Sequence, residues 1–90
     1  MESTIDYKSI DPVVLYDIFY ETGTRLGGTY VALMRKARAD GDLQQEHDWR
    51  DRHQQLNNER RAVNPEDTED QIKHIHDWDA LMNKLDPQLT

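Results

Sequence analysis

The chain has no cysteine and only one phenylalanine among its 90 residues. Without cysteine, neither a disulfide nor a cysteine-containing zinc site can stabilise so small a domain, and the composition fits a reducing compartment. No apolar run approaches the ~20 residues that span a bilayer. The first ten residues also lack the basic and apolar regions of a signal peptide. The sequence therefore predicts one marginally stable domain, residues 1–90, in the cytoplasm.

Charge of one sign dominates both ends of the chain. The net charge is −7; residues 1–22 carry −4, residues 23–63 carry +2, and residues 64–90 carry −5. An acidic protein repels nucleic acids and anionic membranes and is attracted to basic protein surfaces. We therefore expect a protein partner, with no direct nucleic-acid or membrane contact. The same charge also serves solubility, and this simpler explanation stays open.

No segment alternates apolar and polar residues, so no β-strand is expected. A first helix is predicted over residues 12–39, after an extended arm of residues 1–10. Asp11 is a good N-cap, and Pro12 suits the first helical position. Two stripes with helical spacing run along it without a change of phase. One comprises Leu15, Phe19, Thr22, Leu26, Thr29 and Leu33; the other comprises Tyr16, Tyr20, Gly23, Gly27, Tyr30 and Met34.

Two further helices are predicted over residues 42–63 and 65–86. The first is capped by Asp42, and the second by Asn64 or by Thr68. Short connections between the helices predict an all-α, antiparallel three-helix bundle with a long first helix. Its core would join the Leu15 stripe to two others: Leu43, Trp49, Leu56 and Val63, and Ile75, Trp78, Met82 and Leu85.

The stretch "ETGTRLGGTY" (residues 21–30) contains three glycines. A nucleotide-binding loop would need a strand before it and, for a P-loop, a lysine after the last glycine, and neither is present. Gly23 and Gly27 instead lie four residues apart on one helical face, where they form a groove that admits a close neighbour. That neighbour is either a helix of this protein or of a dimer mate, or a different protein.

The second stripe of the first helix is not needed by the predicted core. Exposed aromatic residues and methionine are typical of partner-binding surfaces. We therefore predict a partner-binding site that comprises Tyr16, Asp17, Tyr20, Glu21, Gly23, Gly27, Tyr30 and Met34.

The four histidines are the remaining residues that suggest chemistry. "HDW" occurs at residues 47–49 and again at residues 76–78, but no pair of histidines has the spacing of a zinc-binding helix. No nucleophile, base and orienting acid occur together in a recognisable pattern. We therefore expect no catalytic residues, no metal site and no cofactor, and a protein that is not an enzyme.

Small size, acidic charge, the absence of cysteine and an apolar stripe that the predicted core does not use together indicate an inhibitor. In length and three-helix plan the chain resembles the epsilon antitoxins, which neutralise zeta toxins. That resemblance implies that the first helix, "DPVVLYDIFYETGTRLGGTY" (residues 11–30), lies across the active site of a kinase toxin. It further implies that Asp17 and Glu21 face the basic phosphate-binding groups of the toxin. The same resemblance implies that the chain forms a homodimer, or a heterotetramer with its partner. The three glycines are not part of the resemblance.

Two other classes of function remain. A nucleic-acid mimic that inhibits a nuclease or a CRISPR effector would need one continuous acidic face, which the basic residues between Arg25 and Arg61 interrupt. A small metal-binding helical protein would depend on the histidines alone.

Overall fold

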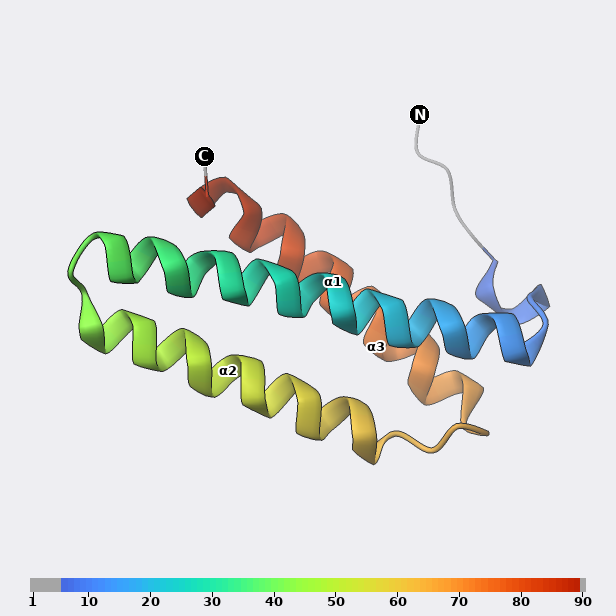
Figure 1. Ribbon diagram of the computed structural model, residues 1–90. Helices are drawn as coiled ribbons and strands as arrows, with labels where there is room; N and C mark the ends of the chain where they lie inside the picture. Colours follow the sequence, from blue (N-terminus) through green and yellow to red (C-terminus); the bar gives the residue numbers. More distant parts are fainter. Residues whose placement is uncertain (1–5, 90) are drawn as a thin grey trace.

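The computed structural model describes residues 6–89 and consists of helices joined by short connections (Figure 1). Three α-helices, α1 (Pro12–Ala39), α2 (Leu43–Ala62) and α3 (Thr68–Leu85), follow one another along the chain. Short 3₁₀-helices η1 (Tyr7–Ser9) and η2 (Asp86–Leu89) flank them. No strand occurs in the described residues. The predicted all-α bundle with a long first helix is thereby confirmed.

Helix α1 is continuous through Gly27 and Gly28. The Asp11 carboxylate accepts a hydrogen bond from the Val13 N–H at 2.9 Å, which satisfies one of the free donors of the first turn. At the other end, the Asp42 N–H donates to the Ala37 carbonyl at 2.9 Å, around a left-handed Gly41 with φ of 75°. This arrangement is a glycine C-terminal cap, and it reverses the chain into α2.

The start of α3 differs from the sequence-based expectation. Asp67 is the N-cap, since its carboxylate accepts from the Asp70 N–H at 3.1 Å; neither Asn64 nor Thr68 takes this role. The buried Gln71 instead donates its amide to the carbonyls of Asn64 and Pro65, at 3.2 and 2.8 Å. These bonds hold the preceding residues in a loop, so α3 begins three residues later than predicted.

The N-terminal segment also differs from the expected extended arm. Residues Tyr7–Ser9 form the turn η1, in which the Asp6 carboxylate accepts from the Lys8 N–H at 3.1 Å. The remainder of the predicted arm, residues 1–5, lies outside the described residues.

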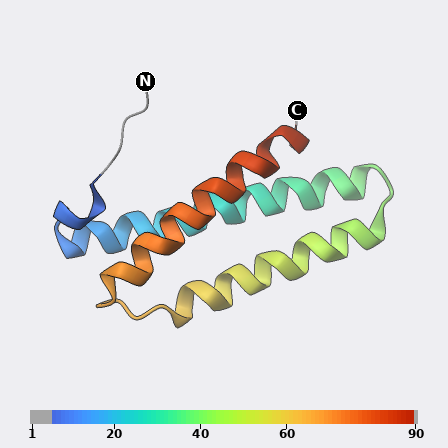
Figure 2. The same ribbon diagram turned by 180° about the vertical axis from the view of Figure 1, so that it is seen from behind.

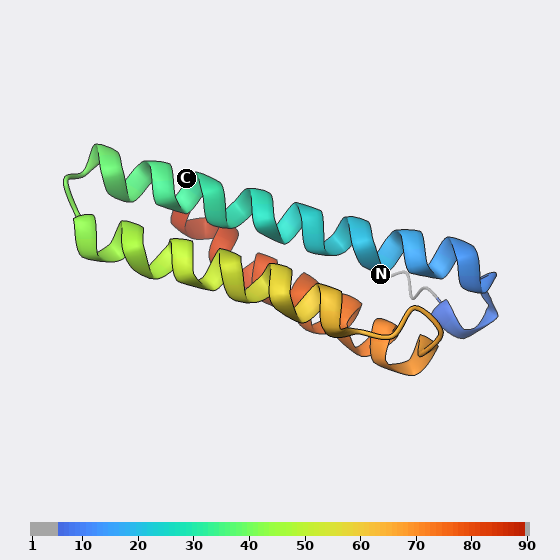
Figure 3. The same cartoon turned by 60° about the horizontal axis from the view of Figure 1, so that its bottom comes forward.

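Helix α1 packs against both other helices, whereas α2 and α3 have little direct contact. Helix α2 runs back alongside α1, and α3 crosses α1 obliquely (Figure 2). From the loop that joins them, α2 and α3 run apart (Figure 2), and α2 lies in front of α3 in Figure 3. The molecule is accordingly flat, with extents of 46 × 34 × 14 Å.

The core lies where α1 meets its two neighbours. Trp49 and Trp78 are buried within it as predicted, with exposed fractions of 8% and 4%. Leu43, however, is 72% exposed, and its assignment to the core was wrong. It precedes Trp49 by six residues, which at 3.6 residues per turn places it about 120° away around α2. The other buried apolar residues are Leu15, Phe19, Leu26, Tyr30, Leu33, Ala37, Leu56, Val63, Ile75, Met82 and Leu85.

A buried carboxylate joins the C-terminal part of α1 to α2. Glu46 is only 7% exposed, and its Oε2 lies 2.7 Å from the Arg38 guanidinium and 3.3 Å from that of Arg50. Arg38 and Arg50 remain largely in solvent, so each guanidinium keeps part of its hydration while it neutralises Glu46. None of the helices in residues 6–89 is long and apolar enough to cross a membrane.

Candidate functional site

The two glycines of the predicted groove lie against α2 and α3. A methyl group added at Gly23 would be 2.9 Å from Cδ of Arg60 and 3.1 Å from Cζ3 of Trp78. One added at Gly27 would be 3.1 Å from Nε2 of His53. The neighbour that these glycines admit is therefore the protein's own α2, with Trp78 of α3 beside it. Of the neighbours that the sequence left open, the structure shows a helix of this protein, so Gly23 and Gly27 are not part of an exposed partner surface.

Tyr30, at the C-terminal end of the predicted site, belongs to the core, and Met34 packs against it. Tyr30 is 5% exposed, and its ring centroid lies 6.0 Å from that of Trp49. Met34 is partly buried against the same cluster. The prediction failed because α1 has two partners and therefore buries two faces, whereas the predicted core used only one of them.

The N-terminal part of the predicted site remains at the surface. Tyr20 is 49% exposed, Asp17 and Glu21 are exposed, and Tyr16 is half-buried. These four residues and Thr24 line one shallow groove. Val13, 72% exposed, continues the row by one turn. We call this surface the α1 face; it comprises Val13, Tyr16, Asp17, Tyr20, Glu21 and Thr24, which follow the spacing of one side of a helix.

The loop before α3 extends the α1 face. Pro65 and Glu66 join Pro12, Val13 and Tyr16 in a second, mostly apolar groove, which also borders Asp17 and Thr68. Val13, Pro65 and Glu66 were not part of the predicted site. Val13 could have been found from its i+3 and i+4 spacing to Tyr16 and Asp17. Pro65 and Glu66 could not, because only the tertiary fold brings this loop to the start of α1.

The carboxylates of the α1 face lack cationic partners. No described residue forms an ion pair or a hydrogen bond with the carboxylate of Asp17 or Glu21, or with that of Glu66 in the adjoining loop; the Glu66 backbone N–H donates to the Asn64 side chain. By contrast, Glu46, Asp77 and Asp79 elsewhere in the bundle each contact a cationic side chain. The face therefore combines exposed aromatic and aliphatic side chains with uncompensated negative charge.

One cation does reach the edge of the α1 face, from α2. Arg60 lies with its guanidinium carbon 4.1 Å from the ring centroid of Tyr20. Its Nη1 donates to the Tyr20 carbonyl at 3.0 Å and to the Thr24 hydroxyl at 2.9 Å. These contacts hold the Tyr20 ring against α2, so that its other side is presented to solvent in a defined orientation.

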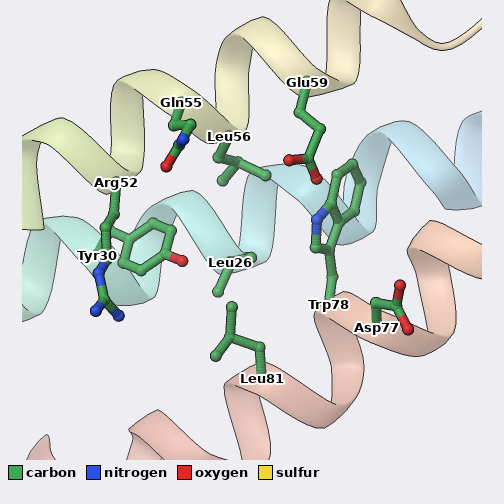
Figure 4. Close-up of a pocket in the computed structure, with 9 residues that line it drawn as sticks. All are labelled: Leu26, Tyr30, Arg52, Gln55, Leu56, Glu59, Asp77, Trp78 and Leu81. Carbon is green, nitrogen blue, oxygen red and sulfur yellow. The ribbon is translucent and has the colours of Figure 1, made fainter.

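A separate crevice of about 250 Å³ opens where α2 and α3 diverge (Figure 4). Helix α1 supplies Leu26 and Tyr30, α2 supplies Arg52, Gln55, Leu56 and Glu59, and α3 supplies Asp77, Trp78 and Leu81. The Tyr30 hydroxyl and the edge of the Trp78 ring that carries its N–H both point into this space (Figure 4). Burial raises the pKa of the Tyr30 phenol; Arg52 lowers it and Glu59 raises it by smaller amounts.

The histidines lie apart, each with its own neighbours. His47 contacts Asp51 on α2, His53 covers Gly27, and His76 packs edge-on against Tyr7. His74 lies between Asp70 and Glu59, with Nδ1 2.8 Å from the Asp70 carbonyl oxygen and Nε2 3.6 Å from the Glu59 carboxylate. Within residues 6–89, no group of three or more potential ligands is arranged to hold a metal ion.

Comparison of the chain with protein-family models, with curated proteins and with solved structures found no match. The function is therefore inferred from the geometry and charge of the surfaces described above.

Proposed function

We propose that this protein binds and inhibits another protein through the α1 face. The observation that carries the proposal is the row of exposed Val13 and Tyr20 beside Asp17 and Glu21, two carboxylates without a cationic partner among the described residues. Exposed aromatic side chains contribute much of the energy in protein interfaces. Charge without a local counterpart is available to a complementary partner.

The partner surface that fits this face is basic and partly apolar. It would place cationic groups opposite Asp17, Glu21 and Glu66, and apolar groups against Val13 and the ring of Tyr20. The face lies on a continuous helix, and Arg60 of α2 bonds to Tyr20 and Thr24 within it, so less conformational entropy is lost on binding than for a flexible segment.

We propose more specifically that the partner is an enzyme whose active site α1 covers. Enzymes that bind phosphorylated substrates carry basic side chains and free backbone N–H groups in their active sites. The acidic α1 face is complementary to such a site. In length and helical plan the chain resembles antitoxins that act in this way on kinase toxins, so a zeta-type kinase toxin is the first partner to test.

The experiment begins with capture of partners from the native host by wild-type protein, Tyr20→Ala and Glu21→Lys. Leu43→Ala is the control, since Leu43 is 72% exposed, against 49% for Tyr20, but lies at the start of α2. A captured protein is then purified, and its affinity for each variant is measured by calorimetry. We expect at least tenfold weaker binding by Tyr20→Ala and Glu21→Lys, and wild-type affinity for Leu43→Ala.

Inhibition is measured separately. The activity of the purified partner is assayed with increasing amounts of wild-type protein, and a purified zeta-type kinase is tested in parallel. Loss of activity that follows the binding curve supports the inhibitor proposal; full activity in the saturated complex would contradict it. Light scattering of the complex gives its composition and distinguishes a 1:1 complex from a heterotetramer.

A further inference from the structure

The crevice between α2 and α3 contains two hydrogen-bond donors with no acceptor among the described residues. Tyr30 is 5% exposed and Trp78 is 4% exposed. Neither the Tyr30 hydroxyl nor the Trp78 indole N–H forms a hydrogen bond with any described residue. Neither atom is fully enclosed, so each keeps some contact with solvent. Both groups are therefore reached through the crevice, into which they point (Figure 4).

The lining of the crevice is about equally polar and apolar, and its rim is charged. Leu26, Leu56 and Leu81 surround the two donors. At the rim, Glu59 contacts His74 and Asp77 contacts Lys73, while the Arg52 guanidinium lies over the Trp49 ring, 5.0 Å from its centroid. The Trp78 N–H can only donate, and the Tyr30 hydroxyl can donate beside it, so a ligand with a hydrogen-bond acceptor would pair both groups.

We propose that this crevice binds a small, neutral, aromatic or aliphatic carbonyl compound, such as a primary amide, a lactone or a ketone. Its carbonyl oxygen accepts hydrogen bonds from the Tyr30 hydroxyl and the Trp78 N–H, and its apolar body lies against Leu26, Leu56 and Leu81. Two carboxylates and one guanidinium at the rim disfavour an anion. An ammonium ion would leave the Trp78 N–H, which can only donate, without an acceptor.

The size of the crevice limits the ligand to about one ring. A volume of about 250 Å³ is just below the range of about 300–1,000 Å³ that is typical of small-molecule sites. The gap between the helices of a bundle is a common place for such sites. This site shares no residue with the α1 face, so it can be tested independently of the proposed inhibition.

Benzamide is a suitable probe because it combines one ring with a neutral carbonyl. Nuclear magnetic resonance offers a direct readout, since the chain has two tryptophans and each gives one indole N–H signal. Trp49→Phe assigns the two signals. We expect benzamide to move the Trp78 indole signal downfield in a saturable manner, and to move the Trp49 signal little.

Three variants test the geometry. Tyr30→Phe removes only a hydroxyl that bonds to no described residue, and should weaken benzamide binding about fivefold, which is the worth of one net hydrogen bond. Leu81→Trp fills the crevice and should abolish binding. Tyr20→Phe removes a hydroxyl from the α1 face and should leave binding unchanged; circular dichroism establishes that each variant is folded.

Several results would overturn the proposal. One is a Trp78 signal that shows no saturable shift up to tens of millimolar benzamide, which would mean that the donors bond to water alone. Equal affinity of wild-type protein and Tyr30→Phe would exclude the hydroxyl as a donor to the ligand. Benzoate or benzylamine that bound as tightly as benzamide would contradict the neutral class of ligand.

Discussion

The Arg60 guanidinium lies over the ring of Tyr20, 4.1 Å from its centroid, and also donates to the Tyr20 carbonyl oxygen. One α2 side chain therefore contacts both the backbone and the aromatic ring of one α1 residue. Its stem fills the space that the missing side chain of Gly23 leaves open. Arg60 thus connects the close packing of α1 against α2 to the geometry of the α1 face.

Replacement of Arg60 by alanine should lower stability and loosen the Tyr20 ring together. We expect a loss of about 1–3 kcal/mol in the free energy of unfolding, because the hydrogen bonds to Tyr20 and Thr24 and the cation–π contact disappear. Urea unfolding followed by circular dichroism measures this loss. Arg61→Ala is the control: Arg61 is exposed, and its replacement should lower the free energy of unfolding by less than about 0.5 kcal/mol. Equal losses for the two variants would exclude a specific role for Arg60.

The glycines of α1 should respond differently to substitution according to their neighbours. Gly28→Ala should raise the free energy of unfolding by up to about 1 kcal/mol, because an added methyl group meets nothing within 4 Å and alanine is the better helix former. Gly23→Leu should instead lower it by about 1–3 kcal/mol through overpacking against Arg60 and Trp78. Thermal melts of the two variants give the comparison, and stabilisation by Gly23→Leu would contradict the observed packing.

Gly41→Ala tests a different property, since Gly41 has open space around it but a φ of 75°. A side chain in that left-handed conformation costs about 1–2 kcal/mol. We expect Gly41→Ala to lower the melting temperature where Gly28→Ala raises it. The same direction of change in both would contradict the role of Gly41 as the C-terminal cap of α1.

Trp78→Ala should be more destabilising than the substitutions of Arg60 or of the glycines. The ring of Trp78 is stacked on Phe19 at a centroid distance of 5.3 Å and also contacts His74 edge-on. Its removal should cost about 3–5 kcal/mol, enough to unfold a marginal domain. Val13→Ala, at a position 72% exposed, should leave the unfolding curve nearly unchanged. Circular dichroism at 25 °C shows whether each of the two variants is folded. A Trp78→Ala variant that is folded and has native stability would contradict the assignment of Trp78 to the core.

Stability should depend on Tyr30 at high pH. Burial raises the pKa of its phenol in the folded protein above the ordinary value of 10.0. As the pH rises, the unfolded chain therefore releases this proton first. The contribution of Tyr30 to the free energy of unfolding is fully present below about pH 10 and is lost as the pH rises toward the folded-state pKa. Urea unfolding between about pH 8 and pH 11.5 should show a steeper decline for wild-type protein than for Tyr30→Phe. Parallel declines would contradict the pKa shift.

Local signals account for the success of the helix predictions. Asp11 with Pro12, Asp42 after Gly41, and the spacing of the apolar residues each act within a few residues, and the structure has a helix at every predicted place. The start of α3 was missed because Gln71 bonds to the carbonyls of Asn64 and Pro65, seven and six residues earlier in the chain, a contact that helical periodicity does not reveal.

Four of the eight residues predicted for the site lie at the surface, whereas Gly23, Gly27 and Tyr30 are buried and Met34 is partly buried. Tyr16, Asp17, Tyr20 and Glu21 lie on the outward side of α1, whereas Gly23, Gly27 and Tyr30 turn toward α2. Both sides of α1 carry apolar residues at helical spacing, so periodicity alone does not indicate which side α2 will cover. That choice depends on the close fit of Arg60 and His53 against the glycines, which only three-dimensional packing determines.

Helix α1 is the shared neighbour of two helices that hardly contact each other, and this arrangement determines how the molecule opens. Separation of α3 from α1 breaks one set of contacts and leaves the hairpin of α1 and α2 intact. Amide hydrogens in the middle of α3 should therefore exchange with solvent through a partial opening, with a smaller free energy than global unfolding requires. Those around Leu26, which both neighbours protect, should exchange most slowly. Helix α3 is then less stable than the hairpin of α1 and α2. The hinge of the opening lies in the loop between α2 and α3, to which Gln71 bonds.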